Sequence, residues 1–266
     1  MKKEDLPVEF LYQLFALIVA TIVVHAFYVT VVRPQADVTI AEQRLALETD
    51  ETYVPDRSFY VLIRDFEQEA CLILLLWAIS IMAYKAWRMN RERSLLQRDL
   101  IPLSEGISIL PEDTREISRP VQALGHGDRG LLLPRTLLTA LHRFRSTRNI
   151  QDVSTSVRTA CEAEAERLDS ELSMVRYIAW AIPSIGFIGT VRGIGEALGQ
   201  AHNAVQGDIT GVTESLGVAF NSTFTALVYS IILMFLLHQL QLFQERLVIE
   251  TQDYCDEHLI SRLQTR

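Results

Sequence analysis

Residues 181–195 read AIPSIGFIGTVRGIG, and this stretch decides how the rest of the chain is interpreted. It is apolar, yet it contains one proline and four glycines. In a water-soluble helix each glycine costs about 1 kcal/mol relative to alanine. In a membrane, small residues instead let helix backbones approach one another closely. The stretch therefore predicts a membrane helix whose role goes beyond anchoring.

Uncharged runs divide the chain of 266 residues. Asp, Glu, Lys and Arg are absent from residues 10–32, 70–84, 177–191 and 215–244. A membrane-spanning helix needs about 20 mostly apolar residues. The second run reaches that length if Glu69 and Lys85 extend toward the headgroups, and the third if Arg192 and Glu196 are accommodated inside protein. We therefore predict an all-α membrane protein with four spans, near residues 9–33, 67–88, 174–199 and 213–240.

Basic residues gather on one side of the predicted spans. Residues 85–98 hold five Lys and Arg against Glu92 alone, whereas residues 34–66 hold seven acids and three arginines. Because Lys and Arg concentrate in cytoplasmic loops, we expect both termini to be cytoplasmic. The predicted order is N-terminus and first span (1–33), outer loop (34–66), second span (67–88), cytoplasmic helical region (89–173), third span (174–199), short outer loop (200–212), fourth span (213–240) and cytoplasmic C-terminal helix (241–266).

Composition and motifs argue against several function classes. The net charge of −8 disfavours a general nucleic-acid binder. Cys71, Cys161 and Cys255 are widely spaced, so neither a disulfide framework nor a metal site is indicated. The Gly-Ile-Gly at 193–195 lacks the preceding strand and the following Lys of a nucleotide-binding loop. We therefore predict no enzymatic activity, no cofactor and no metal.

One face of the third predicted span is small and slightly polar. At 100° per residue, Pro183, Gly186 and Gly193 lie close to the face of Thr190. Backbones can approach closely along such a face. The residues predicted to shape this helix are Pro183, Gly186, Gly189 and Gly193.

A charged pair lies on roughly the opposite side of the third span. Arg192 and Glu196 are one turn apart and can pair as i, i+4 neighbours. An ionised group inside a bilayer is costly, so each must meet the other, a backbone carbonyl or water. Two interpretations stay open: a structural pair that ties helices together near the outer interface, and a role in ion passage.

The fourth predicted span also carries a central threonine on a small face. Thr223 lies on that face and Ser222 flanks it. Threonine hydroxyls in membrane helices often bond only the backbone carbonyl four residues earlier. Two spans with the same feature nevertheless favour a hydroxyl-lined path through Thr190, Thr223 and Ser222. Neither face supplies a carboxylate, so the titratable carrier is expected to come from Glu196 or from another chain.

The predicted cytoplasmic region contains an amphipathic helix and long helical extensions. Apolar residues at 137, 138, 141 and 144 form a stripe surrounded by arginines. Such a helix either packs on its neighbours or lies on a membrane surface. Residues 150–173 lack Gly and Pro and are expected to run into the third span. The fourth span is expected to continue as a helix beyond residue 240.

The motifs of the third and fourth spans resemble those of the MotA/TolQ/ExbB family of ion-driven motor subunits. Residues 186–194, GFIGTVRGI, are similar to the family's G-L-x-G-T-V-x-G-I signature. Residues 219–227, AFNSTFTAL, are similar to its A-L-x-T-T-x-x-G-L segment, although Ser222 and Ala226 replace the usual Thr and Gly. The resemblance covers about residues 150–255.

The resemblance implies a homopentamer in the bacterial inner membrane that encloses a dimer of a single-span, aspartate-bearing partner of the MotB/TolR/ExbD type. It implies that protons or sodium ions pass via that aspartate and via Thr190 and Thr223. The flux would turn the pentamer relative to the dimer and so convert ion-motive force into rotation or mechanical work. Lipids would surround the assembly, and no nucleic acid is expected to bind.

Two other function classes stay open at the level of the sequence. A non-conducting membrane scaffold or signalling oligomer would have no single-span, aspartate-bearing protein encoded beside it. A secondary transporter would show inverted repeats and a midplane substrate site, and the chain shows no internal repeat.

Overall fold

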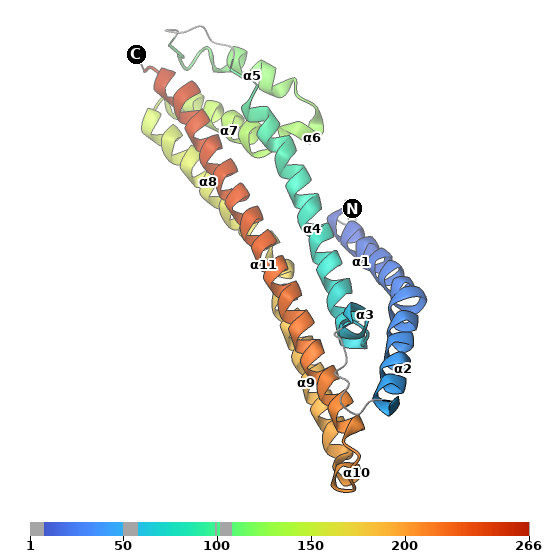
Figure 1. The fold of residues 1–266 in the computed structure, drawn as a ribbon. Helices are drawn as coiled ribbons and strands as arrows, with labels where there is room; N and C mark the ends of the chain where they lie inside the picture. Colours follow the sequence, from blue (N-terminus) through green and yellow to red (C-terminus); the bar gives the residue numbers. More distant parts are fainter. Residues whose placement is uncertain (1–7, 50–57, 99, 102–107, 266) are drawn as a thin grey trace, which may run out of the picture. The chain divides into compact units, whose positions relative to one another are not determined.

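The computed structural model of the chain describes residues 8–49, 58–98, 100–101 and 108–265. Helices dominate these ranges, whose one β-contact is an isolated parallel bridge between Ile109 and Leu263. The helical stretches within them that are long and apolar enough to cross a membrane are Glu9–Ala46, Phe66–Leu96, Ile150–Gly199 and Thr210–Arg262. The prediction of an all-α fold with four helical stretches able to span a membrane is therefore confirmed (Figure 1).

Two compact units divide the chain. The membrane unit comprises Met1–Met82 and Met174–Leu237, and the insert unit comprises Ala83–Ser173 and His238–Arg266. Each unit is assembled from segments that lie far apart in the sequence. Two long helices, α4 and α11, contribute to both units.

A long helical path opens the membrane unit. Helix α1 (Val8–Phe27) passes through a π-helical turn (Tyr28–Val32) into α2 (Arg33–Thr49) without interruption. Pro34 lacks an N–H and disfavours regular helix, and the wider turn directly before it accommodates that defect. The segment 34–66, expected as an outer loop, therefore begins as helix and remains helical as far as Thr49.

Three long helices and two short ones make up the rest of the membrane unit. The long helices are α4 (Phe66–Leu96), α9 (Ser173–Gly199) and α11 (Thr210–His258). The short α3 (Phe59–Leu62) precedes α4, and the short α10 (Ala201–Val205) precedes α11. As expected, the fourth span continues as one helix well beyond residue 240.

Polar contacts fasten α1 to α4. The Tyr12 hydroxyl lies 2.8 Å from the Ser80 hydroxyl, and the Trp77 indole N–H donates to the carbonyl of Gln13 at 2.9 Å. Each contact satisfies a polar group that would otherwise face hydrocarbon, where an unpaired donor costs several kcal/mol. The two helices are therefore fixed to each other by more than apolar packing.

Large apolar side chains cover the outer surfaces of the membrane unit. Phe15 on α1, Trp180 on α9 and Phe220 on α11 are each at least 66% exposed. Many more exposed Leu, Ile, Val and Phe side chains surround them on the same helices. An apolar surface of this extent is a liability in water and is normal in a bilayer.

The insert unit contains two helices, α7 (Leu132–Thr147) and α8 (Ile150–Glu171), that are joined by a short turn. Helix α7 ends at Arg148, whose φ of 53° lies in the left-handed region. Asn149 then caps α8 by accepting a 2.9 Å hydrogen bond from the backbone N–H of Gln151. The turn and the cap bring α7 and α8 into extensive contact.

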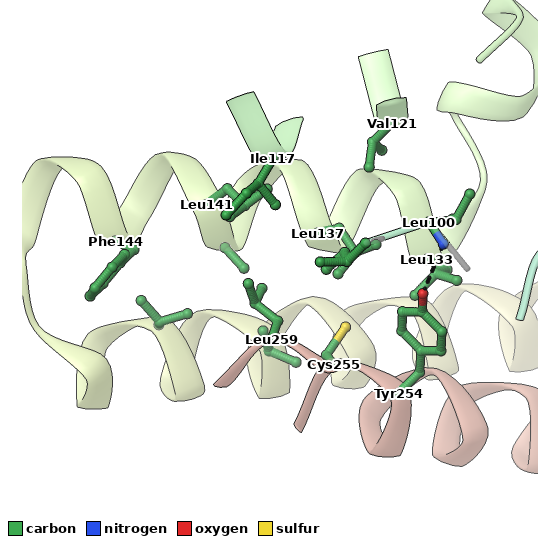
Figure 2. Close-up of a cluster of buried hydrophobic side chains, with 14 of the residues drawn as sticks. Leu100, Ile117, Val121, Leu133, Leu137, Leu141, Phe144, Tyr254, Cys255 and Leu259 are labelled. Carbon is green, nitrogen blue, oxygen red and sulfur yellow. Dashed lines mark hydrogen bonds between the residues drawn. The ribbon is translucent and has the colours of Figure 1, made fainter. Parts of the chain in front are cut away.

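Two further helices and the C-terminal segment complete the insert unit. Helices α5 (Thr114–Gln122) and α6 (His126–Arg129) precede α7, and a 3₁₀ turn (Ile260–Arg262) follows α11. The Tyr254 hydroxyl of α11 accepts a 3.1 Å hydrogen bond from the backbone N–H of Leu100 (Figure 2).

The core of the insert unit settles the role of the amphipathic helix. Leu137, Leu141 and Phe144 of α7 are at most 2% exposed and belong to one buried cluster with residues of α5, α8 and α11 (Figure 2). Of the two interpretations of the apolar stripe, packing on neighbouring helices is therefore the one that the structure supports.

Candidate functional site

Glycines let α9 and α11 approach at backbone distance. Gly189 and Gly193 are buried, and a Cβ added at Gly193 would lie 2.7 Å from the carbonyl oxygen of Ser215. A Cβ at Gly189 would lie 2.5 Å from that of Ser222, and one at Gly186 would overlap Ala226. These three glycines are therefore required by the contact between the helices, as small residues are in membrane helix pairs.

The two predicted threonines meet inside this contact. The hydroxyls of Thr190 and Thr223 form a hydrogen bond with each other. Thr190 Oγ1 also lies 3.0 Å from the carbonyl oxygen of Ala219, and Thr223 Oγ1 lies 3.1 Å from that of Gly186. Both side chains are half-buried. The small faces predicted for the third and fourth spans thus pack on each other within one chain.

This arrangement leaves the hydroxyl protons a choice of acceptors. A threonine hydroxyl donates one hydrogen bond and accepts two. Thr190 can donate to Ala219, to Thr223 or, at 3.4 Å, to Gly186 of its own helix, and Thr223 can donate to Gly186 or to Thr190. Protons can therefore reorient without movement of the heavy atoms. Such a pair can relay a proton or offer oxygen ligands to a cation, but it does not itself titrate near neutral pH.

Ser222 lies beside the threonine pair and faces another helix. It is 1% exposed, and its hydroxyl donates to the carbonyl of Val218 at 2.9 Å. The side-chain amide of Gln68 on α4 lies 3.4 Å from the same hydroxyl. Gln68 is fully buried, and its Oε1 has no hydrogen-bond partner among the described residues. Ser222 therefore connects the α9–α11 contact to a polar side chain of α4.

Pro183 lies inside α9 one turn before the glycines. A proline removes the helical hydrogen bond to the carbonyl four residues earlier, which here belongs to Ala179. That carbonyl accepts instead from the Ser230 hydroxyl of α11. The proline is thus built into the same helix pair as the threonines.

The charged pair has a third member that the sequence analysis did not predict. Arg192 donates to both carboxylate oxygens of Glu67, at 2.8 and 2.9 Å, and to Glu196 at 3.0 Å. Glu67 stands in the first turn of α4, and its side chain is 12% exposed. A bidentate Arg–carboxylate pair is among the strongest side-chain contacts. The cluster therefore connects α9 to α4. Arg192 and Glu67 both lie near the outer end of a predicted span, and this shared position was the feature of the sequence that could have predicted their contact.

Other charges at span ends are also compensated within the protein. Glu69 was expected to reach toward headgroups, but its side chain is 8% exposed and binds His25 at 2.7 Å and Arg33. Lys85, in the insert unit, is 4% exposed and pairs with Glu171 at 2.9 Å. Ion pairing rather than snorkelling therefore accommodates these charges.

The centre of the predicted spans carries no acid of its own. The acids within those spans all lie close to an end: Glu9, Glu67, Glu69, Glu196 and Glu214. The three cysteines are buried free thiols. Within the part of the chain that the structure describes, no group of three His, Cys, Asp or Glu side chains could hold a metal ion. The site thus offers hydroxyls and backbone carbonyls as its polar groups.

Residues 131–253 match the profile of the MotA/TolQ/ExbB proton channel family. No protein with a curated description and no solved structure matches the chain. The matched region runs from α7 into the last turns of α11 and contains Thr190, Thr223 and the charged residues of α9, whereas α1, α2 and α4 lie outside it.

Proposed function

We propose, from the premise that residues 131–253 form a MotA/TolQ/ExbB proton channel domain, that this protein is the ion-conducting subunit of a membrane motor. The family is one of channel and motor components rather than enzymes. The transported ion is H⁺ or Na⁺, and no catalytic step or cofactor is involved.

The observation that carries the proposal is the Thr190–Thr223 hydroxyl pair. It lies within the close contact of α9 and α11, in surroundings of glycine, alanine and serine. Hydroxyls that serve only as local helix bonds would point to a carbonyl of their own helix. Here each hydroxyl contacts the partner helix, and the contact of Thr190 with Ala219, at 3.0 Å, is shorter than its 3.4 Å contact with Gly186 of its own helix. We assign this pair to the wall of the ion path.

A conducting path also needs a titratable carrier, and the α9–α11 contact supplies none. The carboxylates Glu67, Glu69 and Glu196 are engaged by Arg192, Arg33 and His25. We therefore expect the carrier to come from another chain, and the family resemblance implies that it is an aspartate of a single-span partner. We propose that five copies of this chain surround a dimer of that partner, with the exposed apolar faces of α9 and α11 toward neighbouring copies, the partner and lipid.

The same proposal places the protein in a bacterial inner membrane with both termini in the cytoplasm. The excess of Lys and Arg in residues 85–98 favours a cytoplasmic insert unit. There the insert unit would transmit torque or bind an effector.

Ion flux in membrane vesicles from cells that express the protein together with its partner tests the proposal. Thr190→Val and Thr223→Val are nearly isosteric, and each is expected to lower flux by about 100-fold or more while assembly with the partner is retained. Thr190→Ser is expected to restore most of the flux because it restores the hydroxyl. Thr21→Val is the matched control, since the Thr21 hydroxyl bonds only the carbonyl of Leu17 in its own helix.

Normal flux in both valine variants would refute the role of the pair. If the wild-type assembly moves neither H⁺ nor Na⁺, the alternative of a non-conducting scaffold is supported instead. Affinity purification from native membranes separately tests the partner: a single-span protein with a membrane aspartate is expected to copurify.

A further inference from the structure

A basic groove of about 490 Å³ lies between α5 and α7 of the insert unit. Arg115 and Arg119, one turn apart, line it from α5. His142 and Arg145 line it from α7, beside the partly buried Leu138. The groove therefore combines an apolar base with guanidinium groups on two opposing helices.

Among the described residues, the arginines of this groove have no carboxylate partner, whereas several other arginines of the unit do. No acid lines the groove, and no described residue forms an ion pair with Arg115, Arg119 or Arg145. Arginines of the same unit that do pair with a carboxylate are Arg91, Arg93, Arg135, Arg158 and Arg167. Like charges held close repel one another unless an anion lies between them. The groove therefore carries a local excess of positive charge, although the chain as a whole has a net charge of −8.

The hydrophobic core holds the two walls of the groove in place. Ile117 and Val121 of α5 point toward α7, where Leu137 and Leu141 meet them in the core of the unit (Figure 2). The arginines project from other positions of the same helices. Since the walls are fixed by buried packing, an anion would enter a largely preformed site, which lowers the ordering cost of binding.

We propose that this groove binds the phosphate group of an anionic ligand. The planar guanidinium group matches phosphate oxygens with two parallel N–H donors. The volume lies in the range of about 300–1,000 Å³ that small-molecule sites occupy. Helix α5 lies outside residues 131–253, so one wall belongs to a segment beyond the matched channel domain. The phosphate comes either from a soluble compound or from a lipid headgroup.

Calorimetric titration of the full-length protein in nonionic detergent, at about physiological ionic strength, tests this site. The soluble probes are pyrophosphate and ATP, and the lipid probe is dihexanoyl phosphatidylglycerol, with dihexanoyl phosphatidylcholine as its zwitterionic counterpart. Arg119→Gln and Arg145→Gln are each expected to weaken binding about tenfold. Arg143→Gln is the matched control, because Arg143 lies on α7 with the same charge but does not line the groove.

The pattern of binding among probes and variants distinguishes a soluble ligand from a lipid headgroup. Saturable binding of pyrophosphate or ATP that the groove variants lose and the control retains supports a soluble ligand. The same pattern for phosphatidylglycerol alone, without phosphatidylcholine binding, supports a headgroup. Equal losses in the control and groove variants, or no saturable binding of any phosphate probe, overturn the proposal. Binding of a polyglutamate peptide without binding of phosphate would also overturn it, because it would indicate a carboxylate-bearing protein partner. Unchanged circular dichroism shows that the exposed substitutions leave the fold intact.

Discussion

The hydroxyl of Ser230 donates a 3.3 Å hydrogen bond to the carbonyl oxygen of Ala179, the atom that Pro183 deprives of its helical donor. A defect in one membrane helix is thus satisfied by a side chain of the next. Loss of this hydroxyl leaves a buried carbonyl without a donor, so Ser230→Ala is expected to destabilise the α9–α11 contact by about 1 kcal/mol.

A double-mutant cycle measures that coupling. Pro183→Ala restores an N–H to α9, so Ser230→Ala is expected to cost little in that background. Ser184→Ala is the control, since the Ser184 hydroxyl bonds only Trp180 of its own helix. The free energy of unfolding in mixed detergent micelles is measured for the wild type, the two single variants and the double variant. Equal costs of Ser230→Ala in both backgrounds would contradict the relationship.

The α9–α11 contact also predicts opposite effects for two neighbouring glycines. A methyl at Gly193 would lie 2.7 Å from the Ser215 carbonyl oxygen and 2.8 Å from the Ala219 Cβ, whereas nothing lies within 4 Å of a methyl at Gly195. Gly193→Ala is expected to destabilise the protein by about 1–3 kcal/mol. Gly195→Ala is expected to be neutral or to stabilise it by up to about 1 kcal/mol. Unfolding of both variants in the same micelles checks the prediction, and a similar loss in both would rule out the close approach.

Local sequence patterns predicted the helices and their small faces because those features repeat at the helical period. Thr190, Gly186 and Gly193 share a face at 100° per residue, and the structure places that face against α11. Helical periodicity could not predict that Glu67 binds Arg192, because Glu67 lies 125 residues earlier in another helix.

The length of the helix formed by α1 and α2 could not be predicted from the sequence, for a different reason. Hydropathy marks where a helix leaves the lipid, not where the helix ends. The polar residues after Arg33 are compatible with helix, so α2 continues to Thr49 although the apolar run has stopped. In the insert unit, the stripe of α7 fits both a core and a membrane surface, and only contact with α5 and α11 distinguishes them.

The two carboxylates around Arg192 are expected to contribute unequally. Glu67 binds Arg192 through both oxygens and is 12% exposed, whereas Glu196 makes one contact and is 45% exposed. Glu67→Gln is expected to lower stability by about 1–3 kcal/mol, because it weakens a bidentate charge pair whose carboxylate is mostly buried. Glu196→Gln is expected to cost less than about 1 kcal/mol, since exposed pairs are weak. The free energies of unfolding of the two variants test this prediction. A larger loss of stability in Glu196→Gln than in Glu67→Gln would contradict it.

Acid sensitivity of the insert unit is expected to depend on Glu164. This residue is 2% exposed and accepts hydrogen bonds from Arg135 at 2.7 Å and Arg167 at 3.1 Å. Burial alone would raise the pKa of Glu164, but the hydrogen bonds from Arg167 and Arg135 bring it below its ordinary value of 4.5. A carboxylate with a depressed folded-state pKa adds stability above its unfolded pKa and loses it as the pH falls through the folded pKa.

Glu164→Gln is therefore expected to lower the unfolding temperature at pH 7 and to reduce the further drop on acidification below about pH 4.5. Glu162→Gln is the control, because Glu162 is exposed and lies 3.7 Å from Arg158. Burial raises the pKa of Glu92, so protonation of Glu92 at acid pH changes the free energy of unfolding in the opposite direction from protonation of Glu164. Each variant must therefore be compared with the wild type at the same pH. Thermal unfolding followed by circular dichroism from pH 7 to the acid limit measures the difference. An acid-induced drop in Glu164→Gln as large as that of the wild type would show that another carboxylate governs it.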